Sequence, residues 1–187
     1  MPTEVGTPVG LAPMHVQTHL LCGWCIGNGF RFTPRERLLC MVVSVAPDID
    51  GVGILFSEKA YFNFHHVVAH NLLFALFVSG VFAAFSTHRT KAFLVYLLLM
   101  HLHLLMDFLG SGPGWGIFYF WPFSRWMANN PYAWPFYSWQ NLCFASIFLA
   151  WVLAIAIYDG RTPLEALMPE LDAKLVKTLR RAAVWRR

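Results

Sequence analysis

Long apolar runs, separated by short polar or glycine-rich breaks, are the main pattern of the chain. Residues 67–85 carry no charge and one histidine, and residues 141–158 carry neither charge nor histidine. A third run, residues 92–109, is equally apolar except for two histidines and one aspartate. Because the hydrocarbon core of a bilayer is about 30 Å thick, a spanning helix needs roughly 20 apolar residues. The three runs therefore predict membrane-spanning helices.

Capping residues and helix breakers add two shorter helices to this pattern. The stretch Gly27-Asn28-Gly29 ends the first, and Thr33-Pro34 offers the second an N-cap followed by a first-turn proline. We expect helices at about 14–28, 34–46, 64–85, 90–109 and 139–158. The predicted fold class is all-α, a polytopic transmembrane bundle of about four to five helices.

The C-terminal tail has a different composition. Leucines recur at helical spacing between residues 164 and 179, beside six basic residues. This pattern predicts an amphipathic surface helix on an anionic membrane. The Thr-Pro-Leu-Glu sequence at residues 162–165 predicts a capping box at its start, and Pro169 predicts a kink. We therefore divide the chain into a membrane-embedded domain, residues 1–160, and a basic amphipathic tail, residues 161–187.

Composition agrees with a chain whose solvent is lipid. Hydrophobic residues make up 57% of the chain and charged residues 13%, with a mean hydropathy of +0.50. These values lie outside the range of soluble domains. The first twelve residues include Glu4 and no basic segment, so no cleavable signal peptide is expected. The four cysteines lack the paired spacing of a zinc ribbon or a disulfide framework.

Basic residues are distributed unequally between the two sets of loops that alternating helices would create. One set, together with the tail, holds twelve, whereas the other holds only Lys59 and Arg125. The twelve are Arg31, Arg35, Arg37, Arg89, Lys91, Arg161, Lys174, Lys177, Arg180, Arg181, Arg186 and Arg187. Short loops rich in Lys and Arg stay in the cytoplasm, so the tail is predicted inside and the N-terminus outside.

Residues 111–138, between the last two membrane helices, hold eleven aromatic side chains. Such amphipathic rings favour the headgroup level of the bilayer. Two interpretations follow: an interfacial belt, or a dedicated pocket for an acyl chain or a head group.

The up-and-down path also gathers ionisable side chains on the outer face. They are His19 from the first helix, Asp48 and Asp50 after the second, His65, His66 and His70 at the start of the third, and His103 and Asp107 from the fourth. Ionisable groups at membrane depth are expensive and usually face a bundle interior or a wet cavity. Their common location therefore predicts a metal site near the outer water boundary. His15 shares a helix face with His19 and is either a polar flank or a further ligand.

Helical spacing pairs several of these residues. His103 and Asp107 are four positions apart, which puts them within about 40° of each other on one helix face. His66 shares a face with His70, whereas His101 points about 200° away from His103 and is expected to pack elsewhere. Mixed imidazole and carboxylate ligands suit zinc, manganese or iron better than calcium or copper(I). We therefore expect divalent metal ions, with zinc as the first choice.

The ordered set resembles the YdjM-like membrane-bound metal-dependent hydrolases over residues 19–122. The matching elements are an early histidine, His19; Pro-Asp-x-Asp at residues 47–50; two histidines five apart, His65 and His70; and His-x-x-x-Asp, His103 to Asp107, followed by the glycine-rich turn 112–116 and the hydrophobic-Pro pair 121–122. Family members often read His-Arg-Gly-x-Thr-His-Ser across the central motif, whereas residues 65–71 read His-His-Val-Val-Ala-His-Asn. This departure removes candidate contacts to phosphate and makes His66 a substitute-ligand candidate.

The resemblance implies a membrane-embedded, metal-dependent hydrolase. Its metal ligands would be His19, Asp48, Asp50, His65, His70, His103 and Asp107. The family is in turn distantly similar to zinc-dependent phospholipases C and single-strand nucleases, which implies that the bond broken is a phosphoester. A metal-activated water would attack the substrate, with Asp48 or Asp50 bridging metals or acting as general base.

We therefore predict a hydrolase of a bacterial inner membrane whose site faces the periplasm and whose tail is cytoplasmic. Its expected partners are membrane lipids and a lipid or lipid-linked phosphoester substrate, and not nucleic acid. The alternative is a divalent-metal transporter or sensor that handles the cation as cargo, and a haem-binding bundle is a third interpretation. Ligands gathered near one face favour the hydrolase, because a transporter should carry them along a path through the membrane.

Overall fold

The computed structural model describes residues 16–184, and their secondary structure is helical apart from one isolated antiparallel bridge between Ile117 and Ala128. The elements are α1 (Val16–Gly29), α2 (Pro34–Val45), the 3₁₀-helix η1 (Ala46–Leu55), α3 (Glu58–Phe64), α4 (Leu72–Ala84), α5 (Arg89–Gly110), α6 (Trp139–Tyr158) and α7 (Pro169–Val184). The predicted all-α fold is confirmed.

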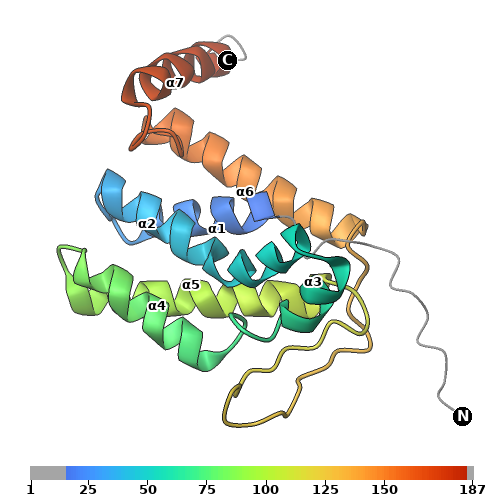
Figure 1. Ribbon diagram of the computed structural model, residues 1–187. Coiled ribbons are helices and arrows are strands. Elements are labelled where there is room, and N and C mark those ends of the chain that lie inside the picture. The colour runs from blue at the N-terminus through green and yellow to red at the C-terminus, as the bar shows by residue number, and fades with distance from the viewer. Residues whose placement is uncertain (1–15, 185–187) are drawn as a thin grey trace, which may run out of the picture.

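Helices α1, α2, α4, α5 and α6 alternate in direction between the two ends of the bundle (Figure 1). The α1–α2 and α4–α5 turns lie at one end, next to the connection from α6 to α7. At the other end lie η1, α3 and the long segment between α5 and α6. The predicted sorting of basic residues into two sets of loops assumed that the helices alternate in direction in this way.

Three helical stretches are long and apolar enough to cross a membrane: Pro34–Leu55, Arg89–Gly110 and Trp139–Tyr158. Helix α4, at 13 residues, is apolar but shorter, and α1 has 14 residues. At 1.5 Å per residue both reach only about 20 Å, less than a hydrocarbon core of about 30 Å. Apolar side chains also point outward, as lipid contact requires; Leu142 and Ile147 on α6 are both 59% exposed.

The hydrophobic core lies between α2, α4 and α5. Val43 and Met100 are fully buried there, and Val78, Val95 and Leu99 are at most 6% exposed. Helix α1 joins this core from the side and packs against both α2 and α6. The bundle therefore fixes the relative positions of the helix ends that carry the ionisable side chains.

The helix predicted over residues 64–85 is interrupted, which corrects the expectation. Helix α3 ends at Phe64, and α4 begins only after Asn71, whose side chain accepts a hydrogen bond from the Phe74 amide at 2.9 Å. The same side chain donates to the carbonyls of Val67 and Val68. An N-cap that also satisfies the preceding carbonyls stops the helix from extending backward. The apolar composition of the run concealed this break.

The start of the tail also differs from the prediction. Glu165 does not complete a capping box; Nε and Nη2 of Arg37 donate to its two carboxylate oxygens, each at 2.5 Å. Trp24 Nε1 donates to the same carboxylate at 3.2 Å, and Arg37 also donates to the Phe32 carbonyl. Helix α7 itself begins at Pro169. The connection between the two predicted regions is therefore anchored to α1 and α2.

Replacing Glu165 with alanine should destabilise the fold by about 3–5 kcal/mol, because it leaves the Arg37 guanidinium buried without a counter-charge. The two side chains are only 6% and 9% exposed. Chemical denaturation of detergent-solubilised protein would measure the change. Glu170→Ala, an exposed site on α7, is the matched control, and equal stability of the two variants would contradict the prediction.

Candidate metal centre

Segments that are far apart in the sequence meet at the end of the bundle that carries η1 and α3. His19 lies on α1, Asp48 and Asp50 lie on η1, and His103 and Asp107 lie on the last turns of α5. The connection between α3 and α4 supplies His65, His66 and His70. Except for Asp48, which is partly accessible, all of these residues are buried, with exposures of 8% or less.

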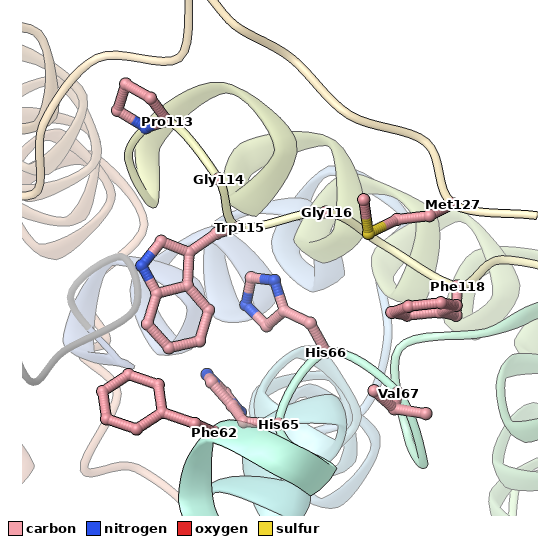
Figure 2. Close-up of a pocket in the computed structure, with 10 residues that line it drawn as sticks. All are labelled: Phe62, His65, His66, Val67, Pro113, Gly114, Trp115, Gly116, Phe118 and Met127. Atoms are coloured by element: carbon pink, nitrogen blue, oxygen red, sulfur yellow. The ribbon is translucent and has the colours of Figure 1, made fainter. Parts of the chain in front are cut away.

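A cavity of about 290 Å³ lies beside these residues and is lined in part by His65 and His66. Its principal lining side chains are Phe62, His65, His66, Trp115, Phe118 and Met127 (Figure 2). In this view Trp115 and Phe62 lie on one side of His66, and Phe118 and Met127 lie on the other. We call this space the Trp115 cavity. It lies directly against the cluster of carboxylates and imidazoles.

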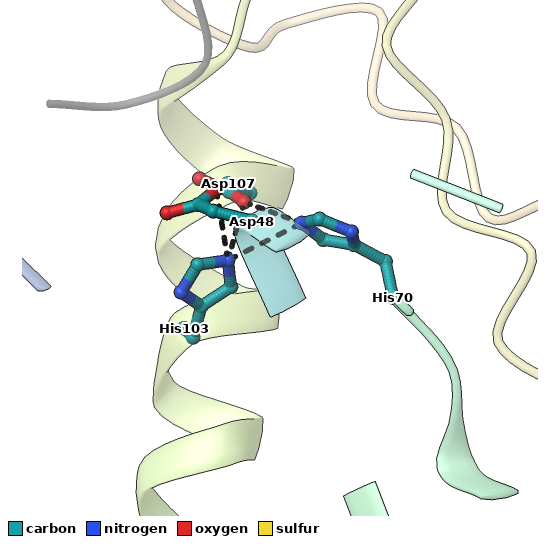
Figure 3. Close-up of side chains that lie close together, drawn as sticks. All are labelled: Asp48, His70, His103 and Asp107. Carbon is teal, nitrogen blue, oxygen red and sulfur yellow. Dashed lines mark hydrogen bonds and ion pairs between the residues drawn. The ribbon is translucent and has the colours of Figure 1, made fainter. Parts of the chain in front are cut away.

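Four of the predicted ligands converge most closely: Asp48, His70, His103 and Asp107 (Figure 3). Asp107 Oδ2 lies 3.0 Å from His103 Nε2 and 3.1 Å from His70 Nε2, and the two Nε2 atoms are 3.2 Å apart. Asp48 Oδ1 lies 3.6 Å from His103 Nε2. Ligand atoms 2.0–2.2 Å from a tetrahedral ion lie roughly 3.3–3.6 Å from one another, so this spacing is close to that of a metal site.

Hydrogen bonds on the far side of each ring determine which nitrogen faces the centre. His103 Nδ1 donates to the carbonyl of Ser44 at 2.7 Å. His70 Nδ1 donates to Asp50 Oδ2 at 3.1 Å. In a neutral imidazole with this hydrogen bond the lone pair lies on Nε2, and in both rings Nε2 is the nitrogen that faces Asp107. Metal-bound histidines in proteins almost always have this arrangement.

Asp50 holds the two imidazoles of the α3–α4 connection. Its Oδ1 accepts from His65 Nδ1 at 2.7 Å, and its Oδ2 accepts from His70 Nδ1 and, at 3.0 Å, from the Ala69 amide. The three side chains Asp50, His65 and His70 also form a second close group. Since both Asp50 oxygens already accept hydrogen bonds, this carboxylate is placed to orient imidazoles more than to offer a free lone pair.

Buried polar atoms without a hydrogen bond are concentrated around the same centre. They include both oxygens of Asp48, both ring nitrogens of His19 and of His66, His65 Nε2 and Asp107 Oδ1. Most buried polar groups in native proteins are satisfied, so such a concentration needs an explanation. His19 Nε2 lies 3.3 Å from Asp107 Oδ1, and its ring stacks on His103 with centroids 4.0 Å apart. A bound cation would satisfy these atoms, so the residues present fit a metal ion.

Electrostatics favour positive charge at the centre of the cluster. Burial alone would lower the pKa of His70, but its hydrogen bonds with Asp107 and Asp50 raise that pKa to about 10. Burial holds the pKa of His66 well below its usual range, so this ring is neutral. The Asp50 and Asp107 carboxylates thus surround the His70 imidazole, which attracts a proton or a metal ion. The neighbouring His66 imidazole stays uncharged.

The structure also places the histidines that the sequence left open. His66 is 1% exposed, has a left-handed backbone with φ 65°, and brings Nε2 to 3.7 Å from Asp107 Oδ2. His101 instead contacts the Leu97 carbonyl and the Tyr119 hydroxyl, in agreement with the expected packing role. His15 lies outside the described residues. No sequence signal identified Ser44, whose backbone carbonyl accepts the hydrogen bond from His103 Nδ1.

A family model described as YdjM inner membrane protein matches residues 14–174, so the chain belongs to this family. The matched range contains every ligand candidate named above. The family description gives a membrane location and no reaction. No curated protein and no solved structure gave a significant match.

Removing one ligand of the converging group should abolish tight metal binding. We expect His103→Ala to weaken divalent-ion affinity by more than about 100-fold, beyond the loss typical of residues that only support a ligand. Elemental analysis and chelator competition on purified protein would measure this. His101→Ala, two positions away on α5, is the control and should keep wild-type metal content. Equal metal content in both variants would contradict the assignment.

Replacing the orienting carboxylate should have a smaller effect. Asp50→Asn keeps the size of the side chain but weakens its hold on the His65 and His70 rings. We expect metal affinity to fall by about 10–100-fold, the range measured for partners that orient a ligand. The same competition titration tests this. An affinity as low as that of His103→Ala would instead indicate that Asp50 binds the metal directly.

Proposed function

We propose that this member of the YdjM family is a membrane-embedded, metal-dependent hydrolase that cleaves a phosphoester of a lipid or lipid-linked substrate. One observation carries the proposal. His70 Nε2, His103 Nε2 and Asp107 Oδ2 lie within 3.2 Å of one another, while both Nδ1 atoms have donated their hydrogens elsewhere. With both Nδ1 atoms donating elsewhere, these three atoms repel one another unless a positive charge, either a proton on His70 Nε2 or a bound cation, lies between them.

Asp48, His70, His103 and Asp107 are the residues that would hold the ion, with His19 beside Asp107. Mixed nitrogen and oxygen ligands favour zinc, with manganese or iron as alternatives. His65 Nε2 and both ring nitrogens of His66 make no hydrogen bond, so they are candidate ligands for a second ion near the first. A divalent ion bound here would supply a water made acidic enough to ionise near pH 7 and would neutralise phosphoryl oxygens.

Asp48 is the better candidate for the general base. Both of its oxygens are buried and lack hydrogen bonds, and its side chain, 11% exposed, is the least buried of the three carboxylate side chains in the cluster. Asp50 is occupied by two imidazoles and the Ala69 amide. A base must lie within hydrogen-bond reach of the proton that it removes and be free to accept it. We therefore assign proton transfer to Asp48 and orientation of His65 and His70 to Asp50.

The proposed location is the inner membrane, with the site facing the periplasm. The turns that carry Arg31, Arg35, Arg89 and Lys91 lie at the opposite end of the bundle from the cluster (Figure 1). Basic loops of this kind remain in the cytoplasm. Water for hydrolysis would then come from the periplasmic side, and the tail would lie on the cytoplasmic surface.

A metal transporter or sensor is the competing proposal. Transport would require polar groups below the cluster, along the bundle. Leu99 and Met100, about one turn below His103 on α5, are at most 1% exposed and belong to the apolar core. Tyr96, one turn further down, bonds only to Ser86 among the described residues. The apolar packing directly beneath the ligands supports the hydrolase.

Activity should require Asp48, both as a ligand and as the base, together with the other ligands. Protein reconstituted with zinc or manganese is expected to release phosphate or alcohol from lipid phosphoesters. Asp48→Asn should reduce kcat by about 10²–10⁴-fold, the usual contribution of a general base. His103→Ala should be inactive, and His101→Ala should retain activity. Absence of turnover by the wild type across a panel of lipid phosphoesters, or equal turnover by His103→Ala, would refute the proposal.

A further inference from the structure

The Trp115 cavity is built almost entirely from apolar groups. Of the described residues that line it, none is charged, and the polar side-chain groups among them are the imidazoles of His65 and His66 and the indole N–H of Trp115. The two basic residues of this end of the bundle, Lys59 and Arg125, are exposed and do not line the cavity. A group bound in this space would therefore meet aromatic rings and hydrocarbon, not cationic side chains.

Aromatic packing forms the outer wall of the cavity. The Trp115 ring lies with its centroid 5.5 Å from Phe62, 5.6 Å from His65 and 5.3 Å from His66. Trp115 follows Gly114, whose φ of 91° is accessible mainly to glycine. Gly116 allows Met127 to close the other side, because a Cβ at this position would lie 2.5 Å from the Met127 sulfur.

The floor of the cavity is in contact with the metal centre. His65 donates to Asp50, and His66 Nε2 lies 3.7 Å from Asp107 Oδ2. The left-handed backbone at His66 turns this ring between the cavity and the carboxylate, and such backbone outliers are often found at functional sites. A single imidazole therefore separates an apolar space from the proposed cation.

The surroundings of the cavity are suited to the membrane interface. Leu55 and Phe56, which precede α3, are 80% and 83% exposed. Phe123, in the segment that carries Trp115, is also 83% exposed. Exposed apolar and aromatic side chains at one end of a membrane bundle favour the boundary between headgroups and acyl chains. A surface of this kind suits an approach to the cavity by amphiphiles.

We propose that the Trp115 cavity binds the first segment of the hydrocarbon chain of an amphiphilic phosphoester and so places its phosphate against His66 and the metal centre. This inference rests on the proposed function. Buried sugar hydroxyls would need more hydrogen-bond partners than two imidazoles and one indole N–H supply, which disfavours a glycan in this space. At about 290 Å³ the cavity is near the lower limit of ligand pockets, so the rest of the chain stays in the bilayer.

Binding of short amphiphiles to metal-loaded protein in nanodiscs tests the inference without requiring turnover. The probes are inorganic phosphate, then ethyl, butyl and octyl phosphate, and the matching alkanols. Affinity for both alkyl series should rise by up to about fourfold for each methylene that enters the cavity, the factor expected for burying one CH₂. Inorganic phosphate reports on the metal centre alone.

Two variants alter the cavity in opposite ways. Trp115→Ala removes its wall, and Val67→Trp fills it. Both should lose most of the dependence on chain length while keeping wild-type metal content and affinity for inorganic phosphate. Trp126→Ala is the matched control, because Trp126 lines a separate apolar hollow with Leu105 and Phe108 and should leave the dependence unchanged.

The outcomes separate this inference from the function on which it rests. The same chain-length dependence in all three variants would show that alkyl groups bind to the bilayer or elsewhere, and would overturn the inference. If alkanols bind in the cavity but the phosphate group adds no affinity in the presence of metal, the cavity assignment is supported and the phosphoester function fails.

Discussion

The buried Asp50 carboxylate is the interaction on which the rest of the site depends. It accepts hydrogen bonds from two imidazoles and one backbone amide of the α3–α4 connection. Burying a carboxylate is costly unless it is hydrogen bonded, and the Ala69 amide can donate to Asp50 because the segment that carries it is not helical. The Asp50 carboxylate therefore supports the break that the Asn71 cap makes in the helix, and it also orients His70 toward Asp107.

The sequence predicted the framework well because its signals were local. Apolar run length and capping residues located α2, α5 and α6 to within one residue at most termini, and helical periodicity placed His103 and Asp107 on one face. The break before α4 could not be predicted in this way, since the residues of the connection donate hydrogen bonds to Asp50, a residue about twenty positions earlier. The same limit explains Glu165, which fits a capping box locally but pairs with Arg37 on a different helix.

The sequence predicted which residues lie together in the candidate site, but not which of them bind metal and which orient a ligand. Asp48 and Asp50 are equivalent in a Pro-Asp-x-Asp motif, and their roles separate only when hydrogen-bond partners are known. Asp50 is occupied on both oxygens, whereas Asp48 has no hydrogen bond. His66 was likewise undecided, because its position depends on a left-handed backbone that periodicity does not encode. Long-range distances, not composition, distinguish orientation from ligation here.

The absence of a cationic side chain from the described lining of the cluster and cavity links metal to substrate. In many phosphoryl-transfer sites Arg or Lys shares the neutralisation of phosphate with the metal. Here only a bound cation, or the proton on His70, can provide that charge. Affinity for the phosphate group should therefore depend on metal loading, whereas affinity for an alkyl chain depends on the aromatic wall built around Trp115. Substrate affinity would then have two independent contributions, an electrostatic one from the metal centre and a hydrophobic one from the cavity, on either side of His66. A substrate must make both kinds of contact to be positioned for hydrolysis.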